Sequence, residues 1–433
     1  MQSLETYGSL GTVSSLSISR LGFLMLPSNL PLARPAMSWA SSLATADQEE
    51  EQAGVVLQRT VAYIGAPFCE GQNLVGTDLA PTALREAGLQ AALARIGWDW
   101  EDQGDIDFKA HFRELRGAGG EATVEYQHTI QLYREWVSSG MAENFSTWVS
   151  RKRKRKRAAQ GGAEEGVLST HTPGQVDNSA MIGSGLRLVY DAVDMAARGG
   201  SFVLTVGGDH SIASASIAAL HRTYPDLAVI WIDAHADANT PETSPSGHYH
   251  GMPAAHLMGW FDQEKPVDGF EWFPHKGCLS ESRLAYVGLR DIDAQEGKLL
   301  RRSSVHCFTM REVDKHGIAK VIESALQAVD PNGRRPLHLS LDIDGIDPHF
   351  APGTGTCARG GLSYREIHYI CEELALTRRL VSMDLVEVNP ALDAPPPSGP
   401  MHGDDPTIKA SPQTVRLAAE LVLSALGKTI LPA

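Results

Sequence analysis

The sequence predicts a three-layer α/β/α fold built on one mostly parallel sheet, and three observations support this. Short apolar runs rich in β-branched residues, such as 227–232 and 337–341, alternate with longer segments in which apolar residues recur at helical spacing. Strands that alternate with helices form βαβ units, whose right-handed crossovers place helices on both faces of a parallel sheet. Acidic and histidine residues directly follow several of the runs, at the edge where such sheets bind ligands.

The individual elements follow from the same two patterns. Strands are expected where short apolar runs occur, at 61–64, 203–206, 227–232, 283–287, 337–341 and 380–383. The first helix is expected at 80–96, because Pro81 suits the first turn of a helix and apolar residues repeat at helical spacing after it. Further helices are expected on the same spacing at 180–197, 213–223, 313–329, 364–376 and 414–426.

Two segments do not fit this pattern. Residues 1–56 are serine-rich with a single acid, Glu5, before Asp47, which predicts an N-terminal extension that is disordered or serves as a targeting segment. Residues 57–433 are expected to form one catalytic domain, interrupted at about 142–177 by an insertion. The insertion contains seven consecutive basic residues, 151–157, which repel one another and favour a solvated surface loop over a nuclear-import or polyanion-binding patch.

Composition narrows the class of protein. The formal net charge of −14 argues against general affinity for nucleic acid, despite the basic run. No run of 18 apolar residues is present, so a membrane partner is not expected. The five cysteines are scattered without a C-x-x-C pair, which favours a reducing compartment and no disulfide framework. We therefore expect a cytoplasmic protein, with a mitochondrial or other organellar location as the alternative.

Ionisable side chains follow three of the expected strands, mostly at a spacing of two residues. Several carboxylates at the ends of buried strands would repel one another unless positive charge lay among them. Four carboxylates can neutralise two divalent cations, and mixed oxygen and imidazole ligation without thiolate suits manganese better than structural zinc. A single D-x-H-x-D would also fit a loop with capping aspartates, but three such strand ends favour a metal site. The sequence thus predicts two Mn²⁺ per chain, held by His210, Asp233, His235, Asp237, Asp342 and Asp344.

Six segments in this order resemble the ureohydrolase family, and within it the dimanganese arginases. They are G-G-D-H-S, D-A-H-A-D-A-N-T, S-G-H-Y-H-G, S-L-D-I-D-G-I-D-P, G-T-G-T and M-D-L-V-E-V-N-P, and the resemblance extends over about 61–430. It implies an arginase-like fold and hydrolysis of the guanidinium of L-arginine to L-ornithine and urea, by a hydroxide that bridges two Mn²⁺ ions. It further implies that Asp233 and Asp342 bridge these ions, and it favours a homo-oligomer, in particular a trimer.

The resemblance also implies roles for residues near the reacting carbon. Asp237 would orient the nucleophile and carry a proton toward the departing nitrogen. His250 would relay protons between the site and bulk water, since its ordinary pKa is ~6.5. Glu387 would grip the substrate guanidinium with a paired acceptor edge, and Thr356 would shape the site beside it. For His250, a local hydrogen bond in a loop or metal ligation are the alternatives.

The other end of the substrate decides between amino acid and amine. By the same resemblance, Asn239 and Ser246 offer neutral donors to an α-carboxylate, while Asp293 and Glu296 offer negative charge to an α-ammonium. His248 stands where arginases commonly have asparagine, so its contribution to carboxylate binding is left open.

Three other functions remain as alternatives. An agmatinase or another guanidino-compound ureohydrolase would share the metal site but not the carboxylate donors. A catalytically idle relative that senses metal or arginine would be expected to lack a ligand or His250, and the sequence retains both. A nucleic-acid-associated protein would depend on the basic run. Asp209 and Asp347 are expected to be an outer partner of the ligands and a turn residue, respectively.

Overall fold

The computed structural model describes residues 57–116, 172–393, 408 and 411–428. The chain divides into two units, 1–49 and 50–433, and every described residue belongs to the second. The expected extension 1–56 and the basic run 151–157 therefore lie outside the described residues. The last part of the expected insertion, from Thr172, is described, and its Val176 is buried in the core.

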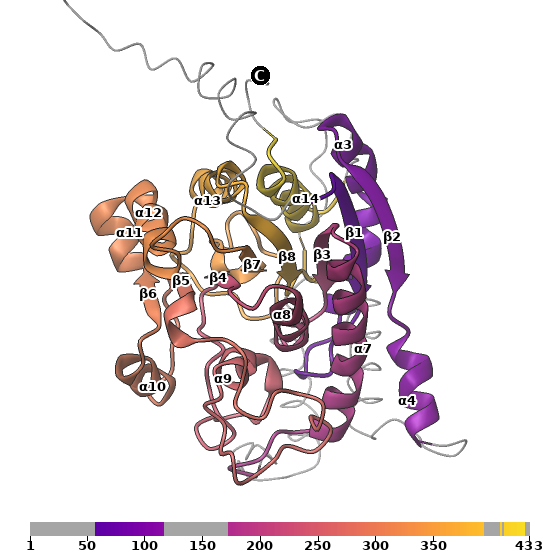
Figure 1. Cartoon of the computed structure of the whole chain (residues 1–433), viewed down its shortest axis with the longest axis vertical. Helices are drawn as coiled ribbons and strands as arrows, with labels where there is room; N and C mark the ends of the chain where they lie inside the picture. Colours follow the sequence, from indigo (N-terminus) through magenta and orange to yellow (C-terminus); the bar gives the residue numbers. More distant parts are fainter. Residues whose placement is uncertain (1–56, 117–171, 394–407, 409–410, 429–433) are drawn as a thin grey trace, which may run out of the picture. The chain divides into compact units, whose positions relative to one another are not determined.

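Within these residues, eight strands form one sheet in the order β2-β1-β3-β8-β7-β4-β5-β6, and every neighbouring pair is parallel. Figure 1 shows this order from β2 on the right to β6 on the left. The predicted mostly parallel sheet is confirmed. The strands are β1 Thr60–Ala66, β2 Asp99–Asp105, β3 Phe202–Gly207, β4 Ala228–Ile232, β5 Leu284–Leu289, β6 His306–Thr309, β7 Leu337–Asp342 and β8 Leu380–Val386.

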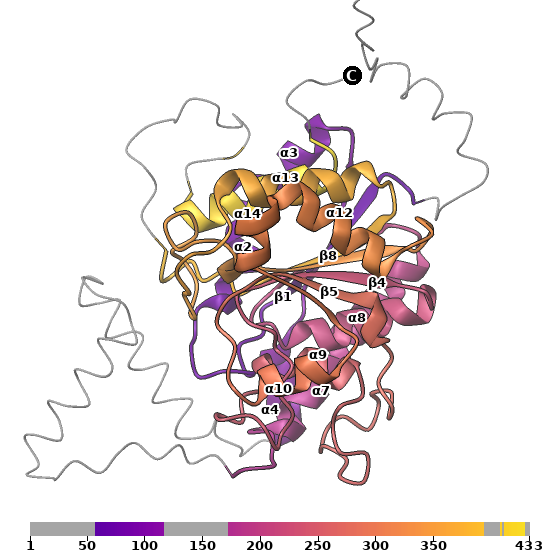
Figure 2. The ribbon, with the colours of Figure 1, turned by 90° about the vertical axis from the view of Figure 1, so that its left-hand side faces the viewer.

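Side chains of the strands alternate between two apolar cores, one on each face of the sheet. Figure 2 shows the helices that cover these two faces. In β4, Ile230 and Ile232 enter one core while Val229 and Trp231 enter the other. The first core is covered by α2 Ala80–Glu86, α3 Leu89–Arg95, α11 Met310–His316, α12 Ile318–Val329, α13 Tyr364–Leu376 and α14 Gln413–Ala425. The second is covered by α4 Phe108–Arg116, α7 Ser179–Arg198, α8 Ile212–Thr223, α9 Pro253–Leu257 and α10 Glu296–Arg302.

In the middle of the sheet, strands that are far apart in sequence lie side by side. β3 and β4 follow each other along the chain, yet β8 and β7 lie between them. Connections that run from β2 toward β6 carry helices of the second core, and those that run back carry helices of the first. One handedness of crossover produces this arrangement. All carboxyl ends therefore meet at one edge of the sheet.

Two predicted helices are each two helices in the structure. The expected helix 80–96 divides into α2 and α3 at Gly88, whose φ is 91°. The expected helix 313–329 begins earlier and divides into α11 and α12 at Gly317, whose φ is 76°. Side chains other than glycine rarely adopt such left-handed backbone, and the turn of direction lets each short helix bury its own apolar residues. None of the helices that the structure describes is long and apolar enough to cross a membrane.

Candidate metal centre

The six predicted ligands lie together at the carboxyl ends of β3, β4 and β7, where they form two groups. The first group is His210, Asp233, Asp237 and Asp342, and the second is Asp233, His235 and Asp344. In each group the ligand atoms lie within 4.8 Å of one another. The geometry thus brings every predicted ligand into reach of one of two cations.

The first group converges on one nitrogen of His210. Its Nδ1 lies 3.0 Å from an oxygen of Asp237, 3.1 Å from one of Asp342 and 3.2 Å from one of Asp233. The His210 side chain has no exposed surface, and those of Asp233 and Asp342 have almost none. This is a closed cluster of one nitrogen and three oxygens.

The second group converges on His235. Its Nδ1 lies 3.1 Å from Oδ2 of Asp344 and 3.4 Å from Oδ1 of Asp233. Because Asp233 faces His210 with its other oxygen, Oδ2, the two oxygens of this carboxylate serve the two groups separately. Asp342 has Oδ2 near His210, while its Oδ1 accepts a hydrogen bond from the Asp344 N–H at 2.8 Å. The predicted bridging by Asp342 remains a prediction.

His210 carries an observation that tests whether a cation fits. Its Nδ1 is fully buried and makes no hydrogen bond, although three carboxylates surround it. Its other nitrogen, Nε2, lies 2.9 Å from the Ser340 hydroxyl oxygen on β7. A ring nitrogen that pairs with a neighbour while the second faces acidic oxygens is the usual arrangement of a metal-ligating histidine. The residues therefore fit a divalent cation.

The pKa values of the ligands reflect their burial and the charges of their neighbours. Burial raises the pKa of Asp342 well above its ordinary range, and the nearby Asp344 and Asp233 raise it further. Burial and Asp233 likewise raise the pKa of Asp237 to about 6. Burial alone would lower the pKa of His210, but Asp233, Asp237 and Asp342 raise it above its ordinary value. Burial and the mutual repulsion of the carboxylates thus favour positive charge among them.

Backbone and side-chain donors orient the ligand carboxylates. The Trp231 indole N–H donates to Oδ2 of Asp233 at 3.0 Å, and its ring stacks on His210 at 4.4 Å between ring centres. The Thr356 hydroxyl donates to Oδ2 of Asp344 at 2.7 Å, which links the G-T-G-T loop to the second group. Donors of this kind fix which oxygen faces the cation.

Gly208 lets the segment that carries His210 approach the end of β1 closely. A Cβ atom at this position would lie 1.5 Å from the Phe68 carbonyl oxygen. The Gly208 N–H donates to the Ala66 carbonyl at 3.0 Å, and the Asp209 N–H donates to that of Phe68 at 2.8 Å. Asp209 in turn accepts the Gly71 and Ser211 N–H groups, which agrees with its expected role outside the ligand set.

Glu387 and His250 lie next to each other beside the first group. Nδ1 of His250 is 3.4 Å from Oε1 of Glu387, which also accepts the His210 N–H at 3.0 Å. Burial would lower the pKa of His250, but Glu387, Asp237 and Asp209 raise it to about 9. Four non-glycine residues of the described chain have positive φ, and two of them are Glu387 at 60° and Asp237 at 49°. Such backbone costs energy and is concentrated at functional sites.

The residues expected at the far end of the substrate form two hydrogen-bonded groups, one of Asn239, Asp293 and Glu296 and one of Ser246 and His248. The Asn239 amide donates to Oδ2 of Asp293 at 2.8 Å, and the Ser246 hydroxyl accepts the His248 N–H at 3.3 Å. Glu296 accepts the Ala238 N–H at 2.8 Å and is almost fully buried. Burial, together with the acids Asp237 and Asp293, raises its pKa to about 8. Asn239 and Asp293 are thus paired before any substrate arrives.

Sequence reasoning missed the residues that support these groups. The Gln72 amide donates to Oε2 of Glu387, and Asn73 Nδ2 lies 2.9 Å from Nε2 of His248. The Arg290 guanidinium donates to the backbone carbonyls of Asp344, Gly345 and Ala358 and so links two loops of the site. Only Gln72 and Asn73 gave a usable signal, because they follow the first strand at the ligand-binding edge.

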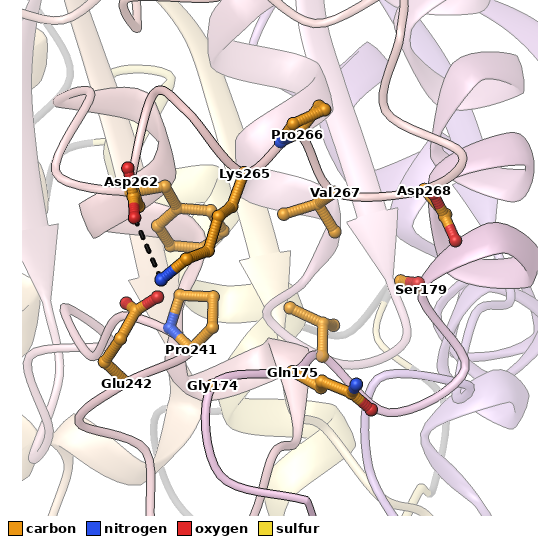
Figure 3. A pocket seen from close by; sticks show the side chains of 12 residues that line it. Gly174, Gln175, Ser179, Pro241, Glu242, Asp262, Lys265, Pro266, Val267 and Asp268 are labelled. Carbon is orange, nitrogen blue, oxygen red and sulfur yellow. Dashed lines mark ion pairs between the residues drawn. The ribbon is translucent and has the colours of Figure 1, made fainter.

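A pocket of about 260 Å³ lies on the segment that follows Asn239. Figure 3 shows Lys265 directed toward Asp262, its partner at 3.0 Å, with Glu242 close by. The Gly174 N–H donates to the Pro241 carbonyl at this pocket, which joins the two segments that line it. Its lining contains no predicted ligand or substrate-binding residue, so it is separate from the metal centre.

Comparison with known proteins agrees with this geometry. The model of the Arginase family matches residues 59–427. An arginase of Plasmodium falciparum (isolate 3D7) is 36% identical over 402 residues, which cover 88% of this chain and 97% of that protein. The structure of the arginase from Bacillus caldovelox has a TM-score of 0.63 at 31% identity, covering 86% of this chain and 100% of that one. The Entamoeba histolytica arginase, solved in complex with L-ornithine, has a TM-score of 0.61 at 25% identity with the same coverage.

Proposed function

The chain belongs to the arginase family, and on this premise we propose that it hydrolyses L-arginine to L-ornithine and urea. The observation that carries the proposal is the pair of ligand groups that share Asp233, with Glu387 and His250 beside them. The members of this family are metal-dependent hydrolases, and the donor set of His210 and its carboxylates fits that chemistry.

We propose two Mn²⁺ ions, one in each ligand group. The ligands are carboxylate oxygens and imidazole nitrogens without thiolate, a set that suits Mn²⁺. When bound, such ions lower the pKa of water so that a strong nucleophile exists near neutral pH. Asp237 lies in the first group and accepts hydrogen bonds well, so it would orient the nucleophile toward the substrate carbon.

Glu387 would hold the substrate guanidinium. Its Oε1 accepts the His210 N–H and faces Nδ1 of His250, and its Oε2 accepts one hydrogen bond, from Gln72. A carboxylate has about four acceptor positions, so capacity remains for the N–H groups of a guanidinium. The positive φ of Glu387 fits a side chain that the local fold constrains to one direction.

His250 would move protons between the site and water. Its side chain is about one-fifth exposed, while Nδ1 faces Glu387 inside the site. Glu387, Asp237 and Asp209 raise the pKa of His250 to about 9 despite its burial, which favours a proton on the ring. The ring could then relay protons between water and Asp237, the residue proposed to carry one to the departing nitrogen. Thr356, hydrogen-bonded to Asp344, would shape the wall beside the guanidinium.

At the far end of the substrate we propose Asn239, Ser246 and His248 as donors to the α-carboxylate, and Asp293 and Glu296 as acids near the α-ammonium. The Asn239–Asp293 hydrogen bond already places a donor next to an acid, as a zwitterionic amino acid requires. An amine without the carboxylate would make none of these hydrogen bonds, and a site built to hydrogen-bond a substrate group can reject an analogue that lacks it by about 10⁴-fold in kcat/KM.

The decisive experiment measures urea release by the full chain from L-arginine and from agmatine, after metal removal and after loading with Mn²⁺. We expect Mn²⁺-dependent release of urea and L-ornithine, with agmatine turned over at least about 10²-fold more slowly. Equal turnover of the two substrates would reduce the proposal to a ureohydrolase of broader specificity. No urea from either substrate in the Mn²⁺-loaded protein would reject it.

We propose that the chain forms a homo-oligomer, with a trimer favoured, and that it acts in the cytoplasm. Light scattering on the purified full chain would test the trimer, since a monomer at working concentration would contradict it. Localisation of the tagged full chain, compared with a chain that begins at residue 57, would test whether 1–56 directs it to an organelle instead.

A further inference from the structure

The turn that carries His250 is anchored from two sides. It spans Tyr249–Gly251, and the His250 side chain faces Glu387. On the side of the metal centre, backbone hydrogen bonds fix the main chain. The His250 N–H donates to the Gly71 carbonyl, and the Asn239 N–H donates to the Gly251 carbonyl. Just after the turn, the Ala254 N–H donates to the Asp237 carbonyl. The preceding side chain, Tyr249, is fully buried and enters the second core.

Tyr249 meets a histidine in that core. Its hydroxyl oxygen lies 2.7 Å from Nδ1 of His256, in the short helix α9 that begins two residues after the turn. His256 lies between two aromatic rings, Phe261 at 4.3 Å and Phe273 at 3.9 Å between ring centres. Burial lowers the pKa of His256 to about 3, so the ring stays neutral and keeps a nitrogen that accepts a hydrogen bond.

We propose that Tyr249 and His256 are positioning residues for proton transfer, and that their hydrogen bond holds the turn so that His250 stays within reach of Glu387. This inference rests on the proposed function, because it assigns Tyr249 an effect on the rate only through His250. Tyr249 and His250 are neighbours with side chains on opposite sides of the turn, so a rotation of one displaces the other. The aromatic partners of His256 limit where its ring, and hence the Tyr249 hydroxyl, can lie.

The effect of breaking the bond should fall on kcat. Tyr249→Phe keeps the ring but removes the hydroxyl and leaves Nδ1 of His256 buried without a partner. Displacement of a reacting group by about 1 Å can lower a rate by as much as about 10²-fold. The Nδ1 of His250 is already 3.4 Å from Oε1 of Glu387, so little further separation is tolerated. We expect kcat on L-arginine to fall about tenfold while KM stays within about twofold.

The test combines single and double variants of the full, Mn²⁺-loaded protein. Tyr249→Phe is measured alone and together with His250→Asn. If Tyr249 acts through His250, its replacement costs less than about twofold once His250 is gone. Tyr249→Phe with His256→Phe replaces both polar partners by apolar rings of similar shape, which leaves no buried group unpaired. This double variant separates loss of the bond from the cost of an unpaired Nδ1: it should stay about as slow as Tyr249→Phe, because the bond that holds the turn is still absent.

A matched control removes another buried tyrosine hydroxyl. Tyr63 is fully buried in β1, and its hydroxyl donates to the Pro81 carbonyl at 2.8 Å. Tyr63→Phe should lower the melting temperature but leave kcat unchanged. A second readout does not depend on turnover: amide hydrogen exchange of the segment 247–252 in the metal-free protein should be faster in Tyr249→Phe and unchanged in Tyr63→Phe.

Three results would overturn the inference: wild-type kcat in Tyr249→Phe, an equal loss of kcat in the His250→Asn background, or unchanged exchange of 247–252. These results differ from failure of the proposed function, in which the wild-type protein itself releases no urea from L-arginine. In that case the exchange measurement alone decides whether the Tyr249–His256 bond anchors the turn.

Discussion

Asp233 differs from the other ligands because its side chain belongs to both ligand groups. One oxygen lies near His210 and the other near His235, so the same carboxylate belongs to both groups. The pKa of Asp233 is lowered: burial alone would raise it, but the nearby imidazoles of His210 and His235 more than offset burial. The pKa of Asp233 is thus shifted in the opposite direction from those of Asp342 and Asp344, which burial raises.

A comparison of two substitutions at the ligands tests this difference. Asp233→Ala removes an oxygen from each group, whereas Asp344→Ala removes one from the second group only. After Mn²⁺ loading and dialysis, we expect about two ions in the wild-type chain, about one in Asp344→Ala and fewer than one in Asp233→Ala. Elemental analysis against protein concentration gives the stoichiometry. Equal metal content in the two variants would contradict the shared role of Asp233.

Substitution of Asp293 tests the far end of the substrate. Asp293 accepts the Asn239 amide and two backbone N–H groups, those of Gln295 and Glu296. Asp293→Ala should raise KM for L-arginine about tenfold and change kcat less, because the residue binds far from the reacting carbon. Asp293→Asn keeps an acceptor oxygen but loses the charge. If KM in Asp293→Asn matches the wild-type value, attraction of the α-ammonium by this charge is excluded.

At the scale of elements, α13 shows how local sequence sets a boundary. Ser363 precedes the helix, its hydroxyl accepts the Glu366 N–H, and Glu366 accepts the Ser363 N–H at 2.8 Å. This reciprocal arrangement satisfies two backbone donors that the first helical turn leaves without partners. The predicted bounds of this helix, 364–376, are those of the structure.

The same cap gives a prediction of stability. Ser363→Ala should lower the free energy of unfolding by about 1 kcal/mol, since one donor of the first turn loses its acceptor. Urea denaturation of the metal-free protein measures the change. Ser363→Thr retains a hydroxyl and should stay close to wild type. A similar loss in both variants would show that the side chain matters for packing rather than for capping.

Elements were predictable from sequence where burial imposed a pattern. The central strands are buried along their whole length, so β4 and β7 appear as apolar runs. The edge strand β2 is mostly exposed and reads D-W-E-D-Q-G-D, which gives no apolar run, and it was not predicted. Helix breaks at Gly88 and Gly317 were missed because apolar spacing continues across them, while only the backbone angle changes.

The candidate site likewise contains residues that were predictable from sequence and residues that were not. The six ligands were predictable because they follow strands at a spacing of two, and the structure brings all of them together. Ser340 and Tyr249 were not predictable from sequence. Ser340 acts through His210, which is distant in sequence, and Tyr249 acts through His256 in the second core. Pairings of this kind depend on tertiary contact and leave no periodic signal in the sequence.

At the scale of the whole molecule, the metal centre is built from residues at the ends of the central strands of the sheet. The ligands follow β3, β4 and β7, Glu387 follows β8, and these are the four central strands of the eight. Loss of any one of them would separate the ligand groups. Cations that bind only the folded protein therefore stabilise the entire described unit rather than one loop.

The pH dependence of this stabilisation can be predicted. Asp237, Asp342 and Asp344 have raised pKa values in the metal-free fold, that of Asp237 to about 6. Groups with raised pKa values stabilise the fold while protonated and lose this contribution as pH rises from their unfolded values, about 4, through their folded values. Through Asp237 the metal-free protein should thus weaken between about pH 4 and pH 6, whereas cations bind more tightly as pH rises further and protons leave the ligands.

We therefore expect Mn²⁺ to raise the melting temperature more at pH 8 than at pH 6. Scanning calorimetry of metal-stripped protein, with and without a fixed Mn²⁺ concentration, gives the two increments. Asp344→Ala serves as a control, because it removes one of the raised carboxyl groups and should reduce the difference between the two pH values. A larger increment at pH 6 would contradict the assigned direction of these pKa shifts.

The position of β7 and β8 between β3 and β4 has a consequence for biosynthesis. A nascent chain that has left the ribosome as far as β6 already carries His210, Asp233, His235 and Asp237, but not Asp342, Asp344 or Glu387. At that stage the sheet lacks its two central strands. β3 can pair with β1 and β4 with β5, but no strand connects β3 to β4. Completion of the sheet then waits for residues 337–433, because long-range strand pairing cannot begin before both partners exist. Both ligand groups would therefore be complete only after β7 and β8 have joined the sheet.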